Sequence, residues 1–234
     1  MHIRLAILLL LAVGWPGAVP AQPGVGENFC QENVSGGDPR GLQRVYCADG
    51  PARVALQGAH ASARPVFYGA APLAGTVGLI RNGAGVAEAY RLALTQGATY
   101  GTVLALKHAV GRPRPYLTYS LDSRSAKYRR ADEGGHTSFP SGHAALSAGL
   151  VASWGLSYPR WYVVGPSAIW AAGVSLSRLH LGVHYPSDIL VGALLGVAVA
   201  GAVHHARTAL TPPRFRRDGP AASMGVPVGI RLAF

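Results

Sequence analysis

Residues Ile189 to Val203 read ILVGALLGVAVAGAV, the longest continuous apolar run among five apolar segments of the chain. These segments are rich in Ala and Leu, are separated by Gly and Pro, and show little of the strict alternation typical of β-strands. They cover residues 66–80, 86–110, 143–158, 161–177 and 188–205. The sequence therefore predicts an all-α fold, a helical bundle of about five to six helices.

The small number of charged residues indicates that this bundle is embedded in a membrane. Charged residues make up 13% of the 234-residue chain, and an average soluble domain has about 25%. Between Gly134 and Arg217 the single carboxylate is Asp188, whereas water-facing helices carry polar and charged residues on their exposed faces. The apolar runs of roughly 15 residues are intermediate between a buried core helix and a membrane span, so a soluble bundle is the alternative.

The net charge of +11 does not indicate nucleic-acid binding. Lys107 and Lys127 are the only lysines, and the arginines are spread over loops instead of forming one basic patch. Arginines in short loops fit the cytoplasmic side of a membrane protein. The loop 108–140 breaks this rule, because it is expected outside and yet carries Arg112, Arg114, Arg124, Lys127, Arg129 and Arg130. Part of this charge therefore needs a chemical explanation.

The amino terminus has the pattern of an export signal. A basic start is followed by the apolar run Leu5 to Val13 and by small residues that end at Ala21. This pattern predicts a signal peptide over residues 1–21, with a retained first membrane helix as the alternative. In either case the Gly- and Pro-rich polar residues 22–65 are exported, and we expect them to form a loop or irregular cap.

Cys30 and Cys47 fall in this exported segment. In an oxidising compartment they are a candidate disulfide, and two unpaired thiols are the alternative. Two cysteines are too few for a small protein built on a disulfide framework. The helical bundle itself is expected to span residues 66–210, followed by an irregular, Pro-rich tail at 211–234.

Three cations lie at the ends of apolar segments. Lys107 is near the end of one, Arg114 just beyond it, and Arg178 at the end of another. Brought together in a partly dry site, they would repel one another by several kcal/mol at an effective dielectric of about 20. A multiply charged anion would offset this repulsion, and arginine and lysine suit phosphate oxygens. Any one of these residues alone is better explained as a solvated loop charge.

The segment Pro140-Ser141-Gly142-His143 immediately precedes an apolar helix. The free N–H groups and the dipole at a helix start favour an anion, and glycine lets the backbone approach it closely. The Ser141 hydroxyl can donate a hydrogen bond to phosphate. Taken alone, the segment is better explained as an ordinary serine N-cap beside a chance histidine.

His180, His184 and Asp188 are spaced by four residues, which would suit a metal site on one helical face. Pro186 argues against this interpretation, because proline breaks a helix there. Ser187 or Asp188 is instead expected to cap the final helix. Asp188 can then reach back to a nitrogen of His184, fix its tautomer and stabilise its protonated form, as in an oriented nucleophile.

In this order, Lys-x6-Arg-Pro, Pro-Ser-Gly-His and Ser-Arg-x5-His-x3-Asp resemble the three-part signature of the type 2 phosphatidic acid phosphatase superfamily. This superfamily also includes bacterial acid phosphatases and vanadium haloperoxidases. Eleven fixed positions match between Lys107 and Asp188, and Ala144 stands where the family often has Thr or Ser. Residues 1–60 and the tail from Thr211 carry no such resemblance.

The resemblance implies a helical bundle and a metal-independent phosphatase that needs no cofactor. His184 would attack phosphorus and form a phosphohistidine, oriented by Asp188, and His143 would protonate the leaving oxygen and then activate water. The phosphoryl oxygens would be held by Lys107, Arg114, Ser141, Gly142 and Arg178.

We therefore expect a hydrolase for a phosphomonoester or pyrophosphate of a lipid, in the bacterial inner membrane with its site facing the periplasm. The first alternative is a soluble periplasmic acid phosphatase of broad specificity. A haloperoxidase is a weaker one, because those relatives are usually longer chains, and a non-catalytic anion-binding membrane protein would not need both histidines and Asp188. The expected partners are the membrane and a phosphorylated lipid, and the motifs do not select among phosphatidate, phosphatidylglycerol phosphate, undecaprenyl pyrophosphate and a lipid A phosphate.

Overall fold

The computed structural model of the chain describes residues 29–48, 50–81, 83, 85–119, 121 and 137–215. The predicted signal peptide, four of the cations in the loop 108–140 (positions 124, 127, 129 and 130) and the tail beyond residue 215 lie outside the described residues. Within the described residues the chain consists of helices and connecting turns, with one isolated bridge between Pro113 and Thr137. The predicted all-α fold is confirmed.

Five long helices form the bundle: α3 (Pro51–Ile80), α4 (Val86–Val110), α7 (Gly142–Ser157), α8 (Trp161–His180) and α9 (Pro186–His205). The shorter helices are α2 (Gly37–Tyr46), α5 (Pro115–Thr118) and α10 (Arg207–Leu210), and a 3-10 turn follows at Pro213–Phe215. The described part of the chain thus has eight α-helices where about five to six were expected. The additional ones lack the long apolar run on which that prediction depended.

Helix α3 begins earlier than the sequence indicates. The expectation that residues 22–65 are an irregular segment is wrong for residues 37–46 and 51–65, which are helical. Pro51 occupies the first turn of α3, where its missing N–H costs nothing. The residues that follow favour a helix intrinsically, but many are polar or charged, so a search for apolar runs passes over them.

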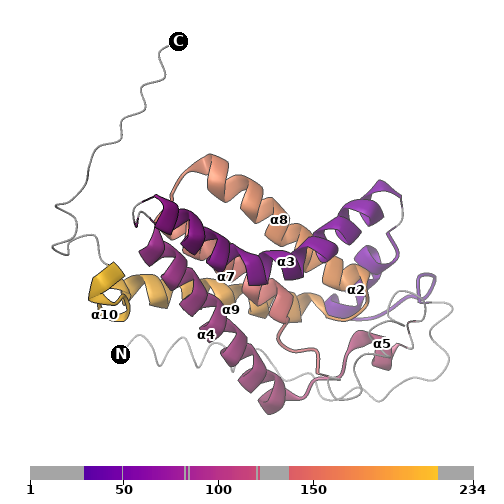
Figure 1. Cartoon of the computed structure of the whole chain (residues 1–234). Helices are drawn as coiled ribbons and strands as arrows, with labels where there is room; N and C mark the ends of the chain where they lie inside the picture. Colours follow the sequence, from indigo (N-terminus) through magenta and orange to yellow (C-terminus); the bar gives the residue numbers. More distant parts are fainter. Residues whose placement is uncertain are drawn as a thin grey trace, which may run out of the picture.

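Helix α7 lies at the centre of the bundle. It packs against α4, α8 and α9, and α3 packs against α4 and α8. Figure 1 shows α2 and α5 at one end of the bundle and α10 at the opposite end. Helix α2 contacts both α8 and α9, near the point where α8 ends and α9 begins.

Helices α7 and α9 approach each other closely because glycines lie at their contact. A Cβ atom on Gly192 would lie 2.5 Å from the carbonyl oxygen of Ser141. A Cβ atom on Gly196 would overlap the backbone of Ala145 and Gly149. This approach requires residues without a side chain, so the two glycines of α9 set its distance from the start of α7.

Helix α2 lies in a disulfide-closed loop and packs on the bundle through a buried core. Cys30 and Cys47 are joined by a disulfide that closes the loop containing α2. Apolar and aromatic side chains from α2 and the residue before Cys30, from α5 and the segment after it, and from the end of α8 and the turn that follows form one cluster: Phe29, Leu42, Tyr46, Tyr116, Leu121, Leu179, Val183 and Tyr185. The loop therefore packs on the turn between α8 and α9, which carries His184.

The outer faces of the long helices expose large apolar side chains. Leu190, Leu194 and Val197 form a stripe along α9, and Ile169 and Leu176 lie two turns apart on α8. In the described part of the chain α9 is the one helix that is long and apolar enough, by length and composition, to cross a membrane. Extended apolar patches of this kind mark surfaces that meet a partner or a membrane.

Candidate active site

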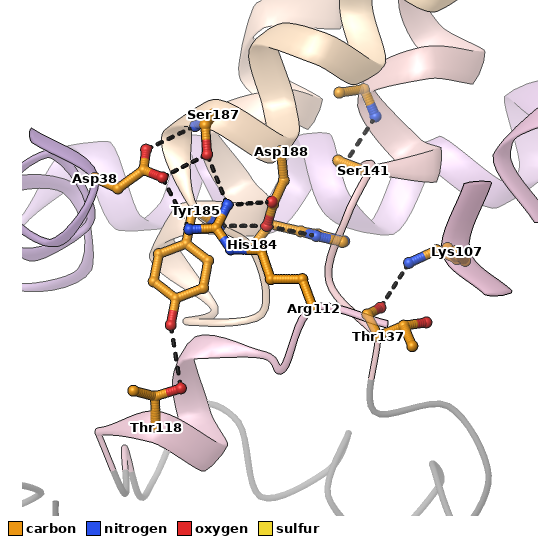
Figure 2. Close-up of polar contacts among 11 residues, drawn as sticks. Asp38, Lys107, Arg112, Thr118, Thr137, Ser141, His184, Tyr185, Ser187 and Asp188 are labelled. Carbon is orange, nitrogen blue, oxygen red and sulfur yellow. Dashed lines mark hydrogen bonds and ion pairs between the residues drawn. The ribbon is translucent and has the colours of Figure 1, made fainter. Parts of the chain in front are cut away.

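The residues of the three motifs come together at the α2 end of the bundle. Lys107 lies in the last turn of α4, and Arg114 caps α5. Ser141 caps α7, Arg178 lies in the last turn of α8, and Asp188 lies in the first turn of α9. Five elements therefore contribute to one site, and Figure 2 includes Lys107, Ser141 and Asp188 among the side chains that it draws.

The start of α7 has the features expected of an anion site. The Ser141 hydroxyl accepts a hydrogen bond from the N–H of Ala144 at 3.5 Å, and the side chain is fully buried. Gly142 is the first residue of the helix, where backbone N–H groups have no partner within the helix. The contact of Ser141 and Gly142 with a phosphoryl group stays a prediction.

His184 lies in the turn between α8 and α9 and is 3% exposed. Burial lowers the pKa of His184 well below the usual 6.5, and the positive charges of Arg114, Arg178 and Lys107 lower it further. The imidazole is therefore neutral at physiological pH, as a nucleophile requires. Its Nδ1 atom lies 3.6 Å from Oδ2 of Asp188, the partner that the motif predicts, at a distance slightly longer than a hydrogen bond.

Two of the three motif cations are oriented by residues outside the motifs. The Nζ atom of Lys107 donates to the carbonyl of Thr137 at 2.7 Å. The Nη1 atom of Arg178, a residue that is 2% exposed, lies 3.1 Å from Nδ1 of His60 on α3. Because a guanidinium only donates, Nδ1 of His60 must accept this hydrogen bond.

His143, in the first turn of α7, has a buried Nε2 atom with no hydrogen-bond partner among the described residues. Its ring centroid lies 5.6 Å from that of Phe67 and 6.2 Å from that of His60. Burying an imidazole nitrogen without a partner is costly. A substrate oxygen or a water molecule at this atom would remove that cost, which suits the predicted acid and base role of His143.

Arg112 is a residue of the site that the three motifs do not mark. Its Nη1 atom donates to Oδ1 of Asp188 and to Oγ of Ser187, both at 2.7 Å, and its Nη2 atom donates to Oδ2 of Asp38 at 2.9 Å. The guanidinium also lies 3.9 Å from the centre of the Tyr185 ring. Burial alone would lower the pKa of Arg112, but the two carboxylates outweigh it and raise that pKa. Figure 2 shows Arg112 between the two carboxylates.

The prediction that Ser187 or Asp188 caps α9 is wrong. Helix α9 begins at Pro186 and has Tyr185 as its N-cap, and Oδ2 of Asp188 accepts from the backbone N–H of Tyr185 at 2.8 Å. Proline at the first helical position is favourable because its missing N–H would have no partner there, which moves the cap to the residue before it. Asp188 thus stabilises the start of α9 through this hydrogen bond and also faces His184.

His180 does not join His184 and Asp188 on one helical face, because α8 ends at this residue. It is buried, and its Nδ1 atom lies 3.4 Å from the carbonyl oxygen of Val45 in α2. Among the described residues, no group of three His, Cys, Asp or Glu side chains is placed to hold a metal ion.

The sequence profile of the PAP2 superfamily matches residues 88–212, which is more than half of the chain. The chain belongs to the PAP2 superfamily. The match includes all eleven motif positions between Lys107 and Asp188. The family resemblance seen in the motifs is therefore confirmed.

Curated PAP2 relatives match parts of the chain. The lipid A 1-phosphatase of Rhizobium johnstonii is 35% identical over 97 residues, which are 39% of this chain and 36% of that protein. The lipid A 4'-phosphatase of Bacteroides thetaiotaomicron is 34% identical over 123 residues, 47% of this chain and 51% of that protein. Phosphatidylglycerophosphatase B of Escherichia coli is 40% identical over 68 residues, 26% of this chain and 25% of that protein. The chain spans about a quarter to a half of the length of these relatives.

Two solved PAP2 structures have a similar fold. The crystal structure of Aquifex aeolicus LpxE superimposes with a TM-score of 0.53 at 20% identity, covering 71% of this chain and 93% of that one. A transmembrane PAP2-type phosphatidylglycerolphosphate phosphatase from Bacillus subtilis gives a TM-score of 0.54 at 21% identity, covering 75% of this chain and 85% of that one. These similarities support the helical fold.

Two residues of the site lie outside the part of the chain that matches the PAP2 profile. His60 contacts Arg178 from α3, and Asp38 contacts Arg112 from α2. Neither belongs to a motif, so spacing in the sequence gave no signal for them. Arg112 had a weak signal, because it lies two residues before Arg114 in a loop with more positive charge than its expected outer position allows.

Proposed function

We propose that this chain is a phosphatase that hydrolyses a phosphomonoester or pyrophosphate of a lipid through a phosphohistidine on His184, without a metal. The observation that carries the proposal is a buried imidazole close to three cations. Lys107, Arg114 and Arg178 all lower the pKa of His184, so all three act on the position where phosphorus would be attacked. A phosphoryl group brings the negative charge that offsets this cluster.

The reaction then has two steps. In the first, a ring nitrogen of His184 bonds to phosphorus while the bond to the leaving oxygen breaks, and His143 gives that oxygen a proton. In the second, water attacks the phosphohistidine, His143 takes a proton from this water, and phosphate leaves as His184 is restored. The three cations stabilise the charge on the phosphoryl oxygens in both transition states.

A lipid substrate is supported by the relatives and by an apolar cavity. The matched proteins are named as phosphatases of lipid A and of phosphatidylglycerophosphate. A cavity of about 710 Å³ lies between α3, α4 and α7, with a lining that includes Val66, Leu73, Val77 and Trp154. Val66, at one end of this lining, is next in the chain to Phe67, whose ring contacts His143, and Arg81 and Glu88 line the other end. We propose that it receives a fatty acyl chain.

A membrane location with the site outside is supported by the distribution of arginines. Arg81, Arg160 and Arg207 are exposed and follow α3, α7 and α9, at the ends of these helices that lie away from the site. The positive-inside rule, applied to the short loops, would place this end in the cytoplasm, although Arg40, Arg44 and Arg53 are exposed at the α2 end. The opposite end, with His184 and the disulfide-closed loop, would then face the periplasm, where disulfides persist.

Phosphate release by the purified protein tests the proposal. The substrates are phosphatidate, phosphatidylglycerol phosphate, undecaprenyl pyrophosphate and lipid A, each in detergent micelles, and para-nitrophenyl phosphate as a soluble phosphomonoester. We expect turnover of at least one lipid and a preference for it over the soluble ester. A carbonate wash of membranes distinguishes a membrane protein from a soluble acid phosphatase, which is the main alternative. A soluble acid phosphatase would be released into the supernatant and would prefer the soluble ester.

The nucleophile is tested by His184→Ala, with His108→Ala as the matched control. His108 is an exposed histidine at the end of α4, so its loss removes the same side chain outside the site. We expect the His184 variant to lose activity by at least about a thousandfold and the control to keep it. With a ³²P-labelled lipid and an alkaline quench, the wild type should yield labelled protein and His184→Ala should yield none, because a phosphohistidine forms only on His184 and survives alkali. Near-normal turnover in His184→Ala would overturn the mechanism.

A further inference from the structure

The first turn of α2 reaches into the site through one carboxylate. Oδ1 of Asp38 accepts from the backbone N–H of Ser187 at 2.9 Å, and Oδ2 accepts from Nη2 of Arg112 at 2.9 Å and from the hydroxyl of Ser187. Both oxygens of Asp38 are therefore used, and both contact Ser187 in the first turn of α9. No sequence motif includes Asp38, which lies 50 residues before the part of the chain that matches the PAP2 profile.

Arg112 connects this carboxylate to the catalytic one. While its Nη2 atom is held by Asp38, its Nη1 atom donates to Oδ1 of Asp188 at 2.7 Å. Oδ2 of Asp188 lies 3.6 Å from Nδ1 of His184. A chain of charged contacts thus runs from Asp38 through Arg112 and Asp188 to the nucleophile, as Figure 2 shows.

Because these groups are buried, the loss of one contact in this series should affect the others. The side chain of Asp188 is fully buried, and that of His184 is 4% exposed. An ionised carboxylate in such a place is stable only when a partner compensates its charge, and Arg112 is that partner. The guanidinium of Arg112 must in turn be held in an orientation that lets Nη1 reach Asp188. The contact of Asp38 with Nη2 of Arg112 provides this orientation.

We propose that Asp38 is a positioning residue for catalysis, which acts through Arg112 and Ser187 to hold Asp188 against His184. The loop closed by Cys30 and Cys47 is then part of the catalytic apparatus. This inference rests on the proposed function, because it assumes that His184 is the nucleophile. It predicts that Asp38 helps to stabilise the transition state. The affinity for phosphate itself should depend on the motif cations and not on Asp38.

The placement of α2 does not depend on Asp38 alone, so its effect on catalysis can be separated from folding. The disulfide closes the loop, and Leu42 and Tyr46 are buried in the shared core. Gly41 packs so closely on Pro186 that a Cβ atom would lie 2.8 Å from the proline ring. A variant without the Asp38 charge should therefore keep α2 in place.

The test compares Asp38→Asn with Glu32→Gln. Both remove one negative charge from the same loop, but Glu32 is exposed and its side chain has no described contact with the site. Each variant is assayed for phosphate release from the panel lipid that the wild type cleaves fastest, for inhibition by orthovanadate, which adopts the geometry of the transition state, and for inhibition by inorganic phosphate. Thermal unfolding is recorded for both.

For Asp38→Asn we expect kcat to fall about tenfold and the inhibition constant of vanadate to rise by a similar factor, as is common when a group that orients a site residue is lost. The inhibition constant of phosphate and the KM should stay within about twofold, and Glu32→Gln should behave as the wild type. Normal kcat and vanadate inhibition in a folded Asp38→Asn would overturn the inference alone, as would equal losses for vanadate and phosphate. A wild type that cleaves none of the substrates would instead overturn the proposed function, and this inference with it.

Discussion

The backbone N–H of Ser141 donates to the backbone carbonyl of Asp188 at 2.9 Å, so the second and third motifs share a hydrogen bond. Gly192, one turn further along α9, presses against the same segment, because a Cβ atom there would lie 2.5 Å from the carbonyl oxygen of Ser141. The starts of α7 and α9 are therefore one packed unit. A small displacement within it moves His143 relative to His184.

Gly192→Ala tests this packing. The added methyl group has to push the backbone of Ser141 away, and overpacking of this kind costs about 1–3 kcal/mol. This cost opposes the gain of about 1 kcal/mol that alanine brings to a helix. We expect a lower melting temperature and a loss of phosphate release of about tenfold or more, because a shift of about 1 Å in a catalytic group has large effects on rate.

Gly201→Ala on the same helix is the matched control. A Cβ atom at Gly201 meets nothing within 4 Å, so the substitution should raise the melting temperature slightly and leave phosphate release unchanged. Equal behaviour of the two alanine variants would show that α7 and α9 are not packed as tightly as the structure indicates.

The pH dependence of the reaction should report on His184. In the proposed mechanism the neutral imidazole attacks phosphorus, and burial together with Arg114, Arg178 and Lys107 lowers the pKa of His184 well below 6.5. A lower pKa means that the nucleophile loses its proton at a lower pH. The loss of activity that comes from protonating His184 should therefore occur below pH 6.5, and not at it.

Arg114→Gln should move this acid limb to higher pH. Removing the positive charge that lowers the pKa of His184 most, after burial, lets the imidazole hold its proton to a higher pH. Profiles of kcat/KM measured over about pH 4 to 9 would show the shift, and the lower overall rate of the variant does not affect the position of the limb. Because the substrate is the same, its own titration cancels in the comparison. Arg160→Gln, an exposed arginine after α7, should leave the profile where it is, and an unshifted Arg114→Gln profile would contradict the assignment.

The contact between Arg178 and His60 gives a further prediction. The Nη1 atom of Arg178 lies 3.1 Å from Nδ1 of His60. His60→Leu removes the acceptor, and we expect kcat/KM to fall by at least about tenfold, because a hydrogen bond to a charged group contributes about 1.5–3 kcal/mol. His60→Asn should recover most of this loss, because its amide oxygen can accept in place of Nδ1. If leucine and asparagine have equal effects on phosphate release, the hydrogen bond does not orient Arg178.

The long helices could be predicted because each contains an apolar run between breaks. The segment 86–110 has the same bounds in the structure, and the later three differ by three residues or fewer at each end. Helix α2 and the first half of α3 could not be found in this way. Their stability depends on contacts distant in sequence, such as Gly41 on Pro186 and the hydrogen bond from Trp170 to Ser62.

The residues of the site also differ in how far the sequence could predict them. The motifs and the family resemblance pointed to His184, His143 and Asp188, and the structure places these three residues in the turn after α8 and in the first turns of α7 and α9, while their catalytic roles stay predictions. The residues that hold them in place carry no such signature. Asp38 is an ordinary acid in the first turn of a short helix, and its role becomes visible when folding brings it to Arg112, 74 residues further along the chain.

The disulfide between Cys30 and Cys47 should matter for activity as well as for stability. Closing a loop with 17 residues of separation contributes about 3 kcal/mol in the chain-entropy model. We expect the double variant Cys30→Ser, Cys47→Ser to melt at a lower temperature, with faster hydrogen exchange in α2. Phosphate release should fall too, since a loosened α2 holds Asp38 less firmly against Arg112.

A double-mutant cycle shows whether the disulfide acts on catalysis through Asp38. Removing the disulfide from the wild type should lower kcat, whereas removing it from Asp38→Asn should lower kcat little further, because the contact that it supports is already lost. The loss of stability should be the same in both backgrounds, as the closed loop is the same. Additive losses of kcat would mean that the loop supports the site by another route, with the buried contact of His180 and Val45 as the next candidate.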